Sequence, residues 1–225
     1  MKNLMPQIRF VLPALALAVL YVPSSLAQTS PSPLASSAGF GGVSAVGDGE
    51  IFVASAPIGW PTGNEPPGIV YRYVKNDDGQ WVEATRLMAM DGQIGDHFGR
   101  SLFLQGDRLV VGSPGVGSAY VFTKHSGSWV QTGKLIPSDL KGDAEFGGAY
   151  ARGGLRTGNI AFVGERIAVT AFGSDSAVNA VHIFRNDGSQ WLEEGILTAN
   201  ETEATEGFAG AITGTDNTVF VAASG

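Results

Sequence analysis

Short apolar runs separated by glycine- and aspartate-rich turns dominate the chain from residue 40 onward. The stretch 101–115 is typical, since SLFLQ and RLVVGSPG flank a tight turn at Gly106-Asp107. Runs of this length bounded by turn residues predict β-strands joined by hairpins. The same reading continues to residue 136, so we expect four strands, at 101–104, 108–112, 118–123 and 129–136.

This pattern recurs along the chain in a fixed register. Three tryptophans are each followed by a leucine six residues later and a phenylalanine seventeen residues later: Trp81, Leu87 and Phe98; Trp129, Leu135 and Phe146; Trp191, Leu197 and Phe208. Internal periods of about 20–50 residues indicate solenoids, propellers or arrays, and these repeats lie at or slightly above that range. The repeats are predicted at 40–97, 98–145 and 146–207, with a partial copy at 208–225.

Four antiparallel strands per repeat predict an all-β fold, a β-propeller of four-stranded blades present as an incomplete arc of about three and a half blades. A solenoid would need shorter coils, and a sandwich would not repeat its aromatic positions so regularly. Segments such as LVVG suit inner strands with two apolar faces, whereas WVQTGK alternates like an outer strand. We expect each outer-strand tryptophan to pack on the neighbouring blade with the next repeat's phenylalanine, and Trp129 to be buried between blades.

Two loops depart from the repeat. The segment 58–68 (IGWPTGNEPPG) is rich in proline and glycine, and the third repeat carries about ten extra residues, near 151–158. Trp60 in the first loop has no counterpart in the other repeats. It is either an exposed anchor for a ligand or a cover for the edge of a blade.

Residues 1–27 form a different kind of sequence. A basic start, an apolar run at 10–22 and small residues at Ser25 and Ala27 predict a cleaved secretory signal. The alternative, a membrane anchor, needs roughly 20 apolar residues, and this run is shorter and interrupted by Pro13. Residues 28–39 read as a disordered Ser/Pro-rich lead-in. The expected location is therefore secreted, periplasmic or on the cell surface, with no stable membrane anchor.

Composition narrows the possible partners. The 225 residues include 32 glycines and no cysteine, with a formal net charge of −7. Without cysteines, disulfides cannot hold an exported fold together. No cluster of Lys and Arg is present, which argues against a nucleic-acid partner.

The repeated motifs carry a family resemblance. Phe40-Gly41, Phe98-Gly99 and Phe146-Gly147 each open a repeat, VGSP follows at 111–114, and MDGQIGDHFG stands at 90–99. At these residues the chain resembles the FG-GAP repeat family, the blades of integrin-type propellers, and in particular bacterial exported arrays. The resemblance covers residues 40–225. It implies an extracellular binding or adhesion module in which the propeller itself is usually not catalytic.

One departure from the family affects metal binding. Integrin-type blades often carry a D-x-D-x-D-G calcium loop between their first two strands. The corresponding turns here, at 47–50, 106–108, 164–166 and 215–217, are too short to wrap a calcium ion. The family's cation sites are therefore not expected, and we predict no metal ligands and no cofactor.

Carboxylates and histidines are the other candidates for chemistry. The carboxylates cluster in the loops between repeats: Asp91 and Asp96; Asp139, Asp143 and Glu145; Glu201, Glu203 and Glu206. They form either weak cation or ligand sites on one rim or turn-stabilising groups, and we favour the turns because their spacing differs between copies. The histidines His97, His125 and His182 occupy unrelated repeat positions, so we predict no catalytic residues.

The sequence thus predicts an exported, non-catalytic scaffold for recognition or adhesion, with an extracellular protein or glycan as ligand. One alternative is the propeller portion of a larger secreted carbohydrate- or ester-processing enzyme, and another is a lectin-like sugar-binding propeller. We also expect further blades in sequence beyond Gly225. The chain 1–225 should then self-associate, because the strand VFVAAS would leave a sheet edge open.

Overall fold

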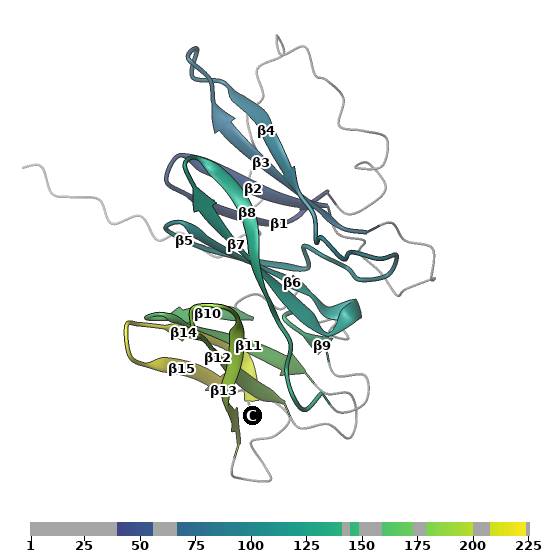
Figure 1. Ribbon diagram of the computed structural model, residues 1–225, viewed down its shortest axis with the longest axis vertical. Coiled ribbons are helices and arrows are strands. Elements are labelled where there is room, and N and C mark those ends of the chain that lie inside the picture. Colours follow the sequence, from purple (N-terminus) through teal and green to yellow (C-terminus); the bar gives the residue numbers. More distant parts are fainter. Residues whose placement is uncertain are drawn as a thin grey trace, which may run out of the picture. The chain divides into compact units, whose positions relative to one another are not determined.

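The computed structural model describes residues 40–55, 67–140, 145–148, 159–172, 179–199 and 208–223 (Figure 1). All of them belong to one compact unit, 32–225. The expectations for residues 1–39, for Trp60 and for the insertion at 151–158 lie outside the described residues.

Antiparallel sheets follow one another along the chain. The first sheet has the order β1-β2-β3-β4, with strands β1 (Phe40–Gly47), β2 (Glu50–Ser55), β3 (Ile69–Lys75) and β4 (Trp81–Leu87). The second sheet has the order β5-β6-β7-β8, with strands β5 (Ser101–Gln105), β6 (Arg108–Ser113), β7 (Ser118–His125) and β8 (Ser128–Leu135). A short 3-10 helix, η1 (Pro114–Val116), joins β6 to β7.

The third and fourth sheets continue the pattern. The third has the order β10-β11-β12-β13, with strands β10 (Ile160–Val163), β11 (Arg166–Phe172), β12 (Ala180–Asn186) and β13 (Trp191–Thr198). The two-residue strand β9 (Glu145–Phe146) also pairs with β11. The fourth sheet consists of β14 (Phe208–Gly214) and β15 (Val219–Ala223). The chain is therefore an all-β protein of four-stranded antiparallel, blade-type sheets, as the sequence predicts.

The four strands predicted for the second sheet are confirmed to within two residues at each end. Their burial also follows the sequence pattern. The inner strand β6 is buried from Leu109 to Ser113, whereas the outer strand β8 alternates between buried and exposed positions. An inner strand is covered on both faces, so both sets of side chains must be apolar or small.

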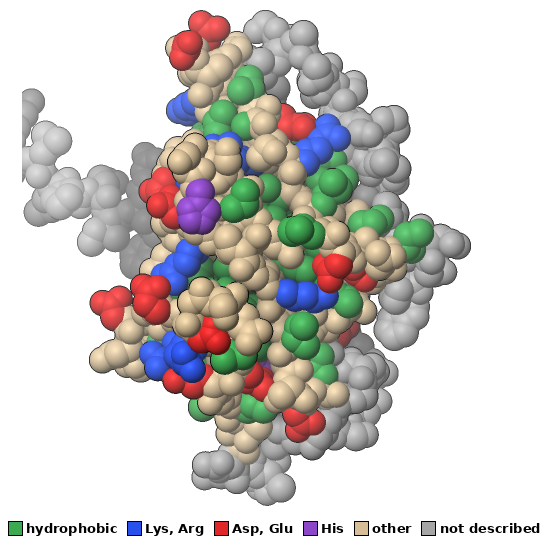
Figure 2. Space-filling model, viewed as in Figure 1, with side chains coloured by type: hydrophobic (Ala, Val, Ile, Leu, Met, Phe, Trp, Pro, Cys, Tyr) green, Lys and Arg blue, Asp and Glu red, His purple; other side chains and the backbone are tan. Residues whose placement is uncertain are grey.

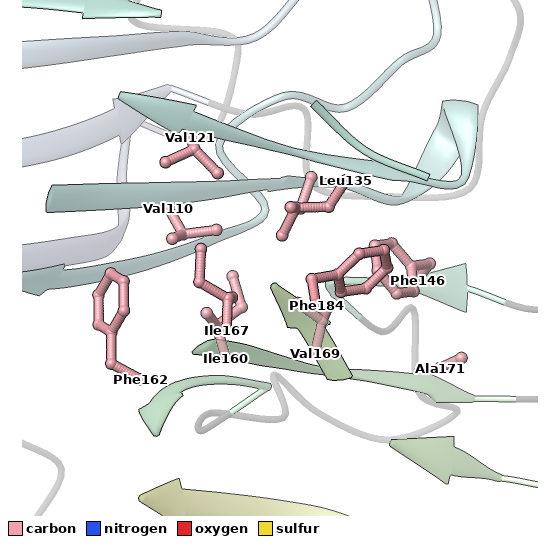
Figure 3. Close-up of a cluster of buried hydrophobic side chains, with 11 residues drawn as sticks. Val110, Val121, Leu135, Phe146, Ile160, Phe162, Ile167, Val169, Ala171 and Phe184 are labelled. Atoms are coloured by element: carbon pink, nitrogen blue, oxygen red, sulfur yellow. The ribbon is translucent and has the colours of Figure 1, made fainter. Parts of the chain in front are cut away.

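Hydrophobic cores lie between consecutive sheets. One cluster joins the first and second sheets, another joins the second and third, and a third joins the third and fourth. Figure 3 shows the second of these, in which Val110 and Leu135 of the second sheet lie toward Ile167 and Phe184 of the third. Each sheet is thus held by the apolar faces of its neighbours.

The phenylalanine that opens each repeat packs within its own sheet. Its ring meets the aromatic residue at one fixed position of the third strand edge-on. The ring centroids are 5.4 Å apart for Phe40 and Tyr71, 5.6 Å for Phe98 and Tyr120, and 5.5 Å for Phe146 and His182. The glycine after this phenylalanine has a positive φ, +94° at Gly99 and +74° at Gly147, which only glycine adopts freely. The Phe-Gly motif is therefore a packing and backbone requirement.

The predicted partner of the tryptophans is wrong. Trp129 is buried between sheets, as expected, but it lies with Phe98 in the cluster between the first and second sheets. Phe146, seventeen residues after Trp129, belongs to the next cluster, where Trp191 packs. Trp129 and Trp191 each pack back on the preceding sheet, whereas the phenylalanine seventeen residues later opens the next sheet. The fixed spacing reflects this crossing, because Trp129 and Phe146 belong to different clusters.

The insertion of the third repeat interrupts its first strand. Both β9 and β10 pair with β11, with Phe146 opposite Ala171 and Ile160 opposite Val169. In the first sheet a single strand, β1, makes the corresponding pairs with β2. The extra residues therefore leave the sheet register on either side unchanged.

A close backbone approach generates the first prediction. A Cβ atom on Gly112 would lie 1.8 Å from the carbonyl oxygen of Gly147 in the next repeat. Because that obstacle is backbone, Gly112→Ala should destabilise the chain by about 1–3 kcal/mol or more, the range for overpacking. Urea unfolding followed by tryptophan fluorescence measures this.

The matched control for this substitution is Gly195→Ala. Gly195 lies in β13, and a Cβ atom there would have no heavy atom within 4 Å. We expect no loss of stability from this substitution. Equal stability losses for the two variants would show that the contact with Gly147 is not what requires glycine at 112.

Candidate functional site

Buried charges gather where consecutive sheets meet. Glu50, the first residue of β2, is 5% exposed and lies between the first and second sheets. Its carboxylate pairs with Arg72 of its own sheet and with Lys124 of the second sheet, at 2.9 Å from Nζ. The Trp129 Nε1–H donates to the same carboxylate at 2.9 Å. One carboxylate thus holds two cations and an indole from two sheets, and we call this group the Glu50 cluster.

The Glu50 cluster keeps its carboxylate ionised. Burial raises the pKa of Glu50, but the hydrogen bonds from Arg72, Lys124 and Trp129 outweigh burial and lower that pKa below its ordinary value. An acid that donates protons in catalysis needs the opposite shift. The cluster is therefore suited to binding the sheets together and not to proton transfer.

A second carboxylate, partly buried, links the third sheet to the loop after β8. Glu193 of β13 accepts a hydrogen bond from His182 Nδ1 at 2.5 Å and one from the Ser138 backbone N–H at 3.0 Å, and the Ser138 hydroxyl also donates to it. Burial raises the pKa of Glu193, but these hydrogen bonds from Ser138 and His182 lower it overall. We call these three residues the Glu193 cluster.

The Glu193 cluster contains a serine, a histidine and a carboxylate, but in an order that does not activate a nucleophile. In a catalytic triad the histidine stands between the serine and the acid and takes the serine proton. Here Glu193 stands between Ser138 and His182, and both groups donate to it. The arrangement fixes the loop after β8 against β13, and it does not activate Ser138.

An equivalent hydrogen bond, from a loop backbone N–H to a side chain of the outer strand, occurs one sheet earlier. Gln131 of β8 accepts the backbone N–H of Met90 at 2.9 Å, just as Glu193 accepts that of Ser138. In both cases the acceptor lies two residues after the tryptophan of the outer strand, and the donor lies three residues after the last leucine of the preceding sheet. A contact that repeats with the fold indicates a structural role.

The carboxylates singled out from sequence have separate roles. Asp96 is buried and its Oδ2 accepts the Gln93 backbone N–H at 2.7 Å, which confirms the turn role. Asp91 instead pairs with Lys134 of β8 at 2.6 Å, and this hydrogen bond lowers the pKa of Asp91. Asp139 lies in the loop after β8, and Glu145 lies in β9. The remaining four, Asp143, Glu201, Glu203 and Glu206, lie outside the described residues.

The structure does not bring the three histidines together. His125 ends β7 at a hairpin, and His182 lies within β12. His97 is buried just before Phe98, with a φ of +56°. In the described part of the chain, no group of three or more His, Asp or Glu side chains is placed to hold a metal ion. No helix in that part is long and apolar enough to span a bilayer.

The Glu50 cluster is not predicted by the sequence analysis, because GDGE at 47–50 is typical of an ordinary hairpin turn. Two signals point to it. A buried tryptophan N–H needs an acceptor, and the positions equivalent to Glu50 in the next two repeats are Arg108 and Arg166. A carboxylate at a position where the next two repeats carry arginine indicates a local partner of positive charge.

The next border shows what changes when that carboxylate is absent. Arg108 turns toward the third sheet, where its guanidinium donates to Glu165 at 3.0 Å and lies 4.6 Å from the centre of the Phe162 ring. The Trp191 Nε1 atom is then buried without a hydrogen-bond partner among the described residues. The first border is therefore the more polar of the two.

Comparison with known proteins supports the repeat assignment. The sequence profile described as FG-GAP repeat matches residues 81–122, from β4 into β7, so the chain carries an FG-GAP repeat there. No curated protein matches the sequence.

Two solved structures show a distant likeness. A europium-containing methanol dehydrogenase is 12% identical, with 75% of this chain and 27% of that chain covered and a TM-score of 0.49. A Bacteroides fragilis protein described as a "putative 6-phosphogluconolactonase" is 13% identical, with 68% and 55% covered and a TM-score of 0.31. The chain thus spans less than two thirds of either structure. At these values neither likeness bears on function.

The burial of Trp129 generates a stability prediction. Trp129 is 7% exposed and its ring meets Phe52 of the first sheet edge-on, with centroids 5.1 Å apart. Trp129→Ala should lower the free energy of unfolding by about 3–5 kcal/mol, the range for truncating a core aromatic. Trp129→Phe, which keeps a ring but loses the bond to Glu50, should cost less.

Trp81→Ala is the matched control, because Trp81 holds the same repeat position in the first sheet but is only partly buried. Its loss in urea unfolding should be clearly smaller than that of Trp129→Ala. Similar losses would mean that burial against the preceding sheet does not account for the contribution of Trp129 to the free energy of unfolding.

The Glu50 cluster generates a pH prediction. Because the pKa of Glu50 is lowered, its stabilisation is present above the ordinary glutamate pKa of about 4.3 and is lost as the pH falls through the lowered value. Glu50→Gln leaves two partly buried cations unpaired, so at pH 7 it should cost up to about 3–5 kcal/mol. The difference from the unsubstituted chain should shrink in acid, as urea unfolding at about pH 7 and pH 3 would show.

Glu165→Gln is the control for this experiment. The Glu165 side chain is 93% exposed and pairs with Arg108 at the surface, so its removal should change stability little at either pH. A Glu50→Gln loss that is equal at both pH values would contradict the role of the ionised carboxylate.

Proposed function

We propose that the chain is an exported, non-catalytic recognition module built on a propeller-type fold, with an extracellular protein or glycan as its ligand. The observation that carries this proposal is the use of the carboxylates at the sheet borders. Glu50 joins the first and second sheets, Glu193 joins the third sheet to the loop after β8, and each has a lowered pKa. Neither lies beside an activated nucleophile, so the interior chemistry supports assembly of the scaffold and not turnover.

The sequence supports export. The basic start, apolar run and small residues of 1–27 have the features of a secretory signal. A fold whose borders are closed by packing and buried ion pairs needs no disulfide, which suits an exported chain without cysteine. The chain carries an FG-GAP repeat at 81–122, and its resemblance to that family implies an extracellular module.

The loop after β4 is the surface that best fits a ligand. Met90 is 83% exposed and Ile94 is 62% exposed, and both lie between β4 and β5. Exposed apolar side chains on a loop held by a rigid scaffold are typical of binding surfaces. On the face drawn in Figure 2, acidic, basic and hydrophobic side chains are interspersed. This mixture favours recognition by apolar and polar contacts together over attraction by charge alone.

The test combines export with binding. Secreted protein should begin at or near Gln28 by N-terminal sequencing, and it should bind defined partners on arrays of extracellular proteins and glycans. Met90→Asp and Ile94→Asp should abolish that binding without changing the thermal unfolding midpoint. Thr132→Asp, at an exposed position of β8, is the control that should still bind.

Turnover of carbohydrate or ester substrates by the purified chain would overturn the non-catalytic assignment. Exported protein that retains Met1 would overturn the cleaved signal. Binding that is unaffected at both loop positions would move the ligand surface elsewhere, with Trp60 as the next residue to substitute.

A further inference from the structure

Two methionines stand at the start of the loop after β4. Met88 directly follows the last residue of β4, and Met90 lies two positions later. They are 55% and 83% exposed. Ala89 between them packs against the cluster that joins the first and second sheets. The chain thus turns one small residue inward at this point and leaves both methionines in solvent.

The backbone that carries these methionines is fixed by hydrogen bonds that involve neither of their side chains. The Met90 N–H donates to the side chain of Gln131 at 2.9 Å, and the Gly92 N–H donates to the carbonyl oxygen of Ala89 at 3.1 Å. Neither methionine belongs to a hydrophobic cluster in the described part of the chain. A chemical change at either sulfur therefore alters the surface without removing a core contact.

The sulfur chemistry of residues 28–225 is confined to this loop. Cysteine and methionine are the side chains whose sulfur oxidants convert stepwise to more polar forms. Residues 28–225 contain no cysteine and no methionine other than Met88 and Met90. An oxidant that acts on sulfur in the exported chain would therefore modify the start of the loop after β4.

We propose that Met88 and Met90 form an oxidation site through which peroxides control ligand recognition by this loop. The inference rests on the proposed function, because Met90 belongs to the surface assigned there to the ligand. The thioether sulfur attacks one oxygen of hydrogen peroxide, and the S–O bond forms as the O–O bond breaks. The second oxygen leaves as water with both peroxide hydrogens. The sulfur loses two electrons to the peroxide and becomes a sulfoxide.

Oxidation changes the polarity of the loop surface and leaves its backbone contacts in place. The thioether is apolar and flexible, whereas the sulfoxide is polar and chiral. Burying a polar group costs free energy unless that group gains a hydrogen bond. A ligand that covers Met90 with an apolar surface therefore binds the oxidised chain less tightly. Because reductases return methionine sulfoxide to methionine, the change is reversible.

Mass spectrometry of the secreted product of this sequence tests the modification. After treatment with dilute hydrogen peroxide, the peptide that contains residues 88–90 should gain two oxygen atoms, one on each methionine. Met90 should be oxidised faster than Met88, because it is the more exposed of the two. Met90→Leu removes one sulfur and should gain a single oxygen atom. The thermal unfolding midpoint should not change. A peptide that gains no oxygen, or a chain that unfolds on oxidation, would overturn the proposal.

Binding before and after oxidation tests the control of recognition. Arrays of extracellular proteins and glycans are probed with the untreated chain, with the peroxide-treated chain, and with treated chain repaired by methionine sulfoxide reductases. Binding should fall about ten-fold or more on treatment, as for the loss of a central contact, and should return on repair. Equal binding after complete oxidation, or a loss that repair does not restore, would contradict the proposal.

The two measurements separate this inference from the proposed function. If the untreated chain binds no member of the arrays, the proposed function fails and the control of recognition fails with it, whereas the mass measurement still decides whether the oxidation site exists. If the untreated and oxidised chains bind equally well, the proposed function stands and this inference alone is wrong.

Discussion

The border between consecutive sheets is the constraint on which the structure depends. Each sheet exposes an apolar face that it cannot bury alone, so the next sheet must cover it, as Leu135 and Ile167 do between the second and third sheets. Polar groups drawn into such a border must find partners there, because an unpaired buried charge is costly. The Glu50 cluster meets this requirement with two cations and an indole from two sheets.

This constraint explains why the repeat motif has the form that it has. Phe98 opens its repeat because its ring must meet Tyr120 edge-on, and Gly99 follows it because the backbone there has a positive φ. Gly112 stands in the second strand because the carbonyl of Gly147 approaches it closely. The residues that identify the repeat are thus packing residues.

The electrostatics of the chain follow from the same borders. Asp91, Glu50 and Glu193 all have lowered pKa values, and each receives a donor from a neighbouring strand, loop or sheet. Carboxylates that looked like possible cation ligands or turn caps are therefore divided between turns and ion pairs. Because the pKa of the buried, paired Glu50 is lowered, we expect the stability of the fold to fall in acid.

The sequence by itself determined the strands, their order and the burial of Trp129, because hydrophobic periodicity and turn residues act locally and recur in every repeat. Only the tertiary structure decided which residues meet across a border. The sequence placed Trp129 with Phe146, whereas the fold packs it with Phe98, since a tryptophan late in one sheet faces backward and the next phenylalanine has crossed forward. Glu50 was likewise hidden in a turn motif, because its partners Lys124 and Trp129 lie more than seventy residues away along the chain. Residues so far apart in the sequence leave no local pattern that would reveal their pairing. The ion pair is therefore identified only when the two sheets are seen packed together.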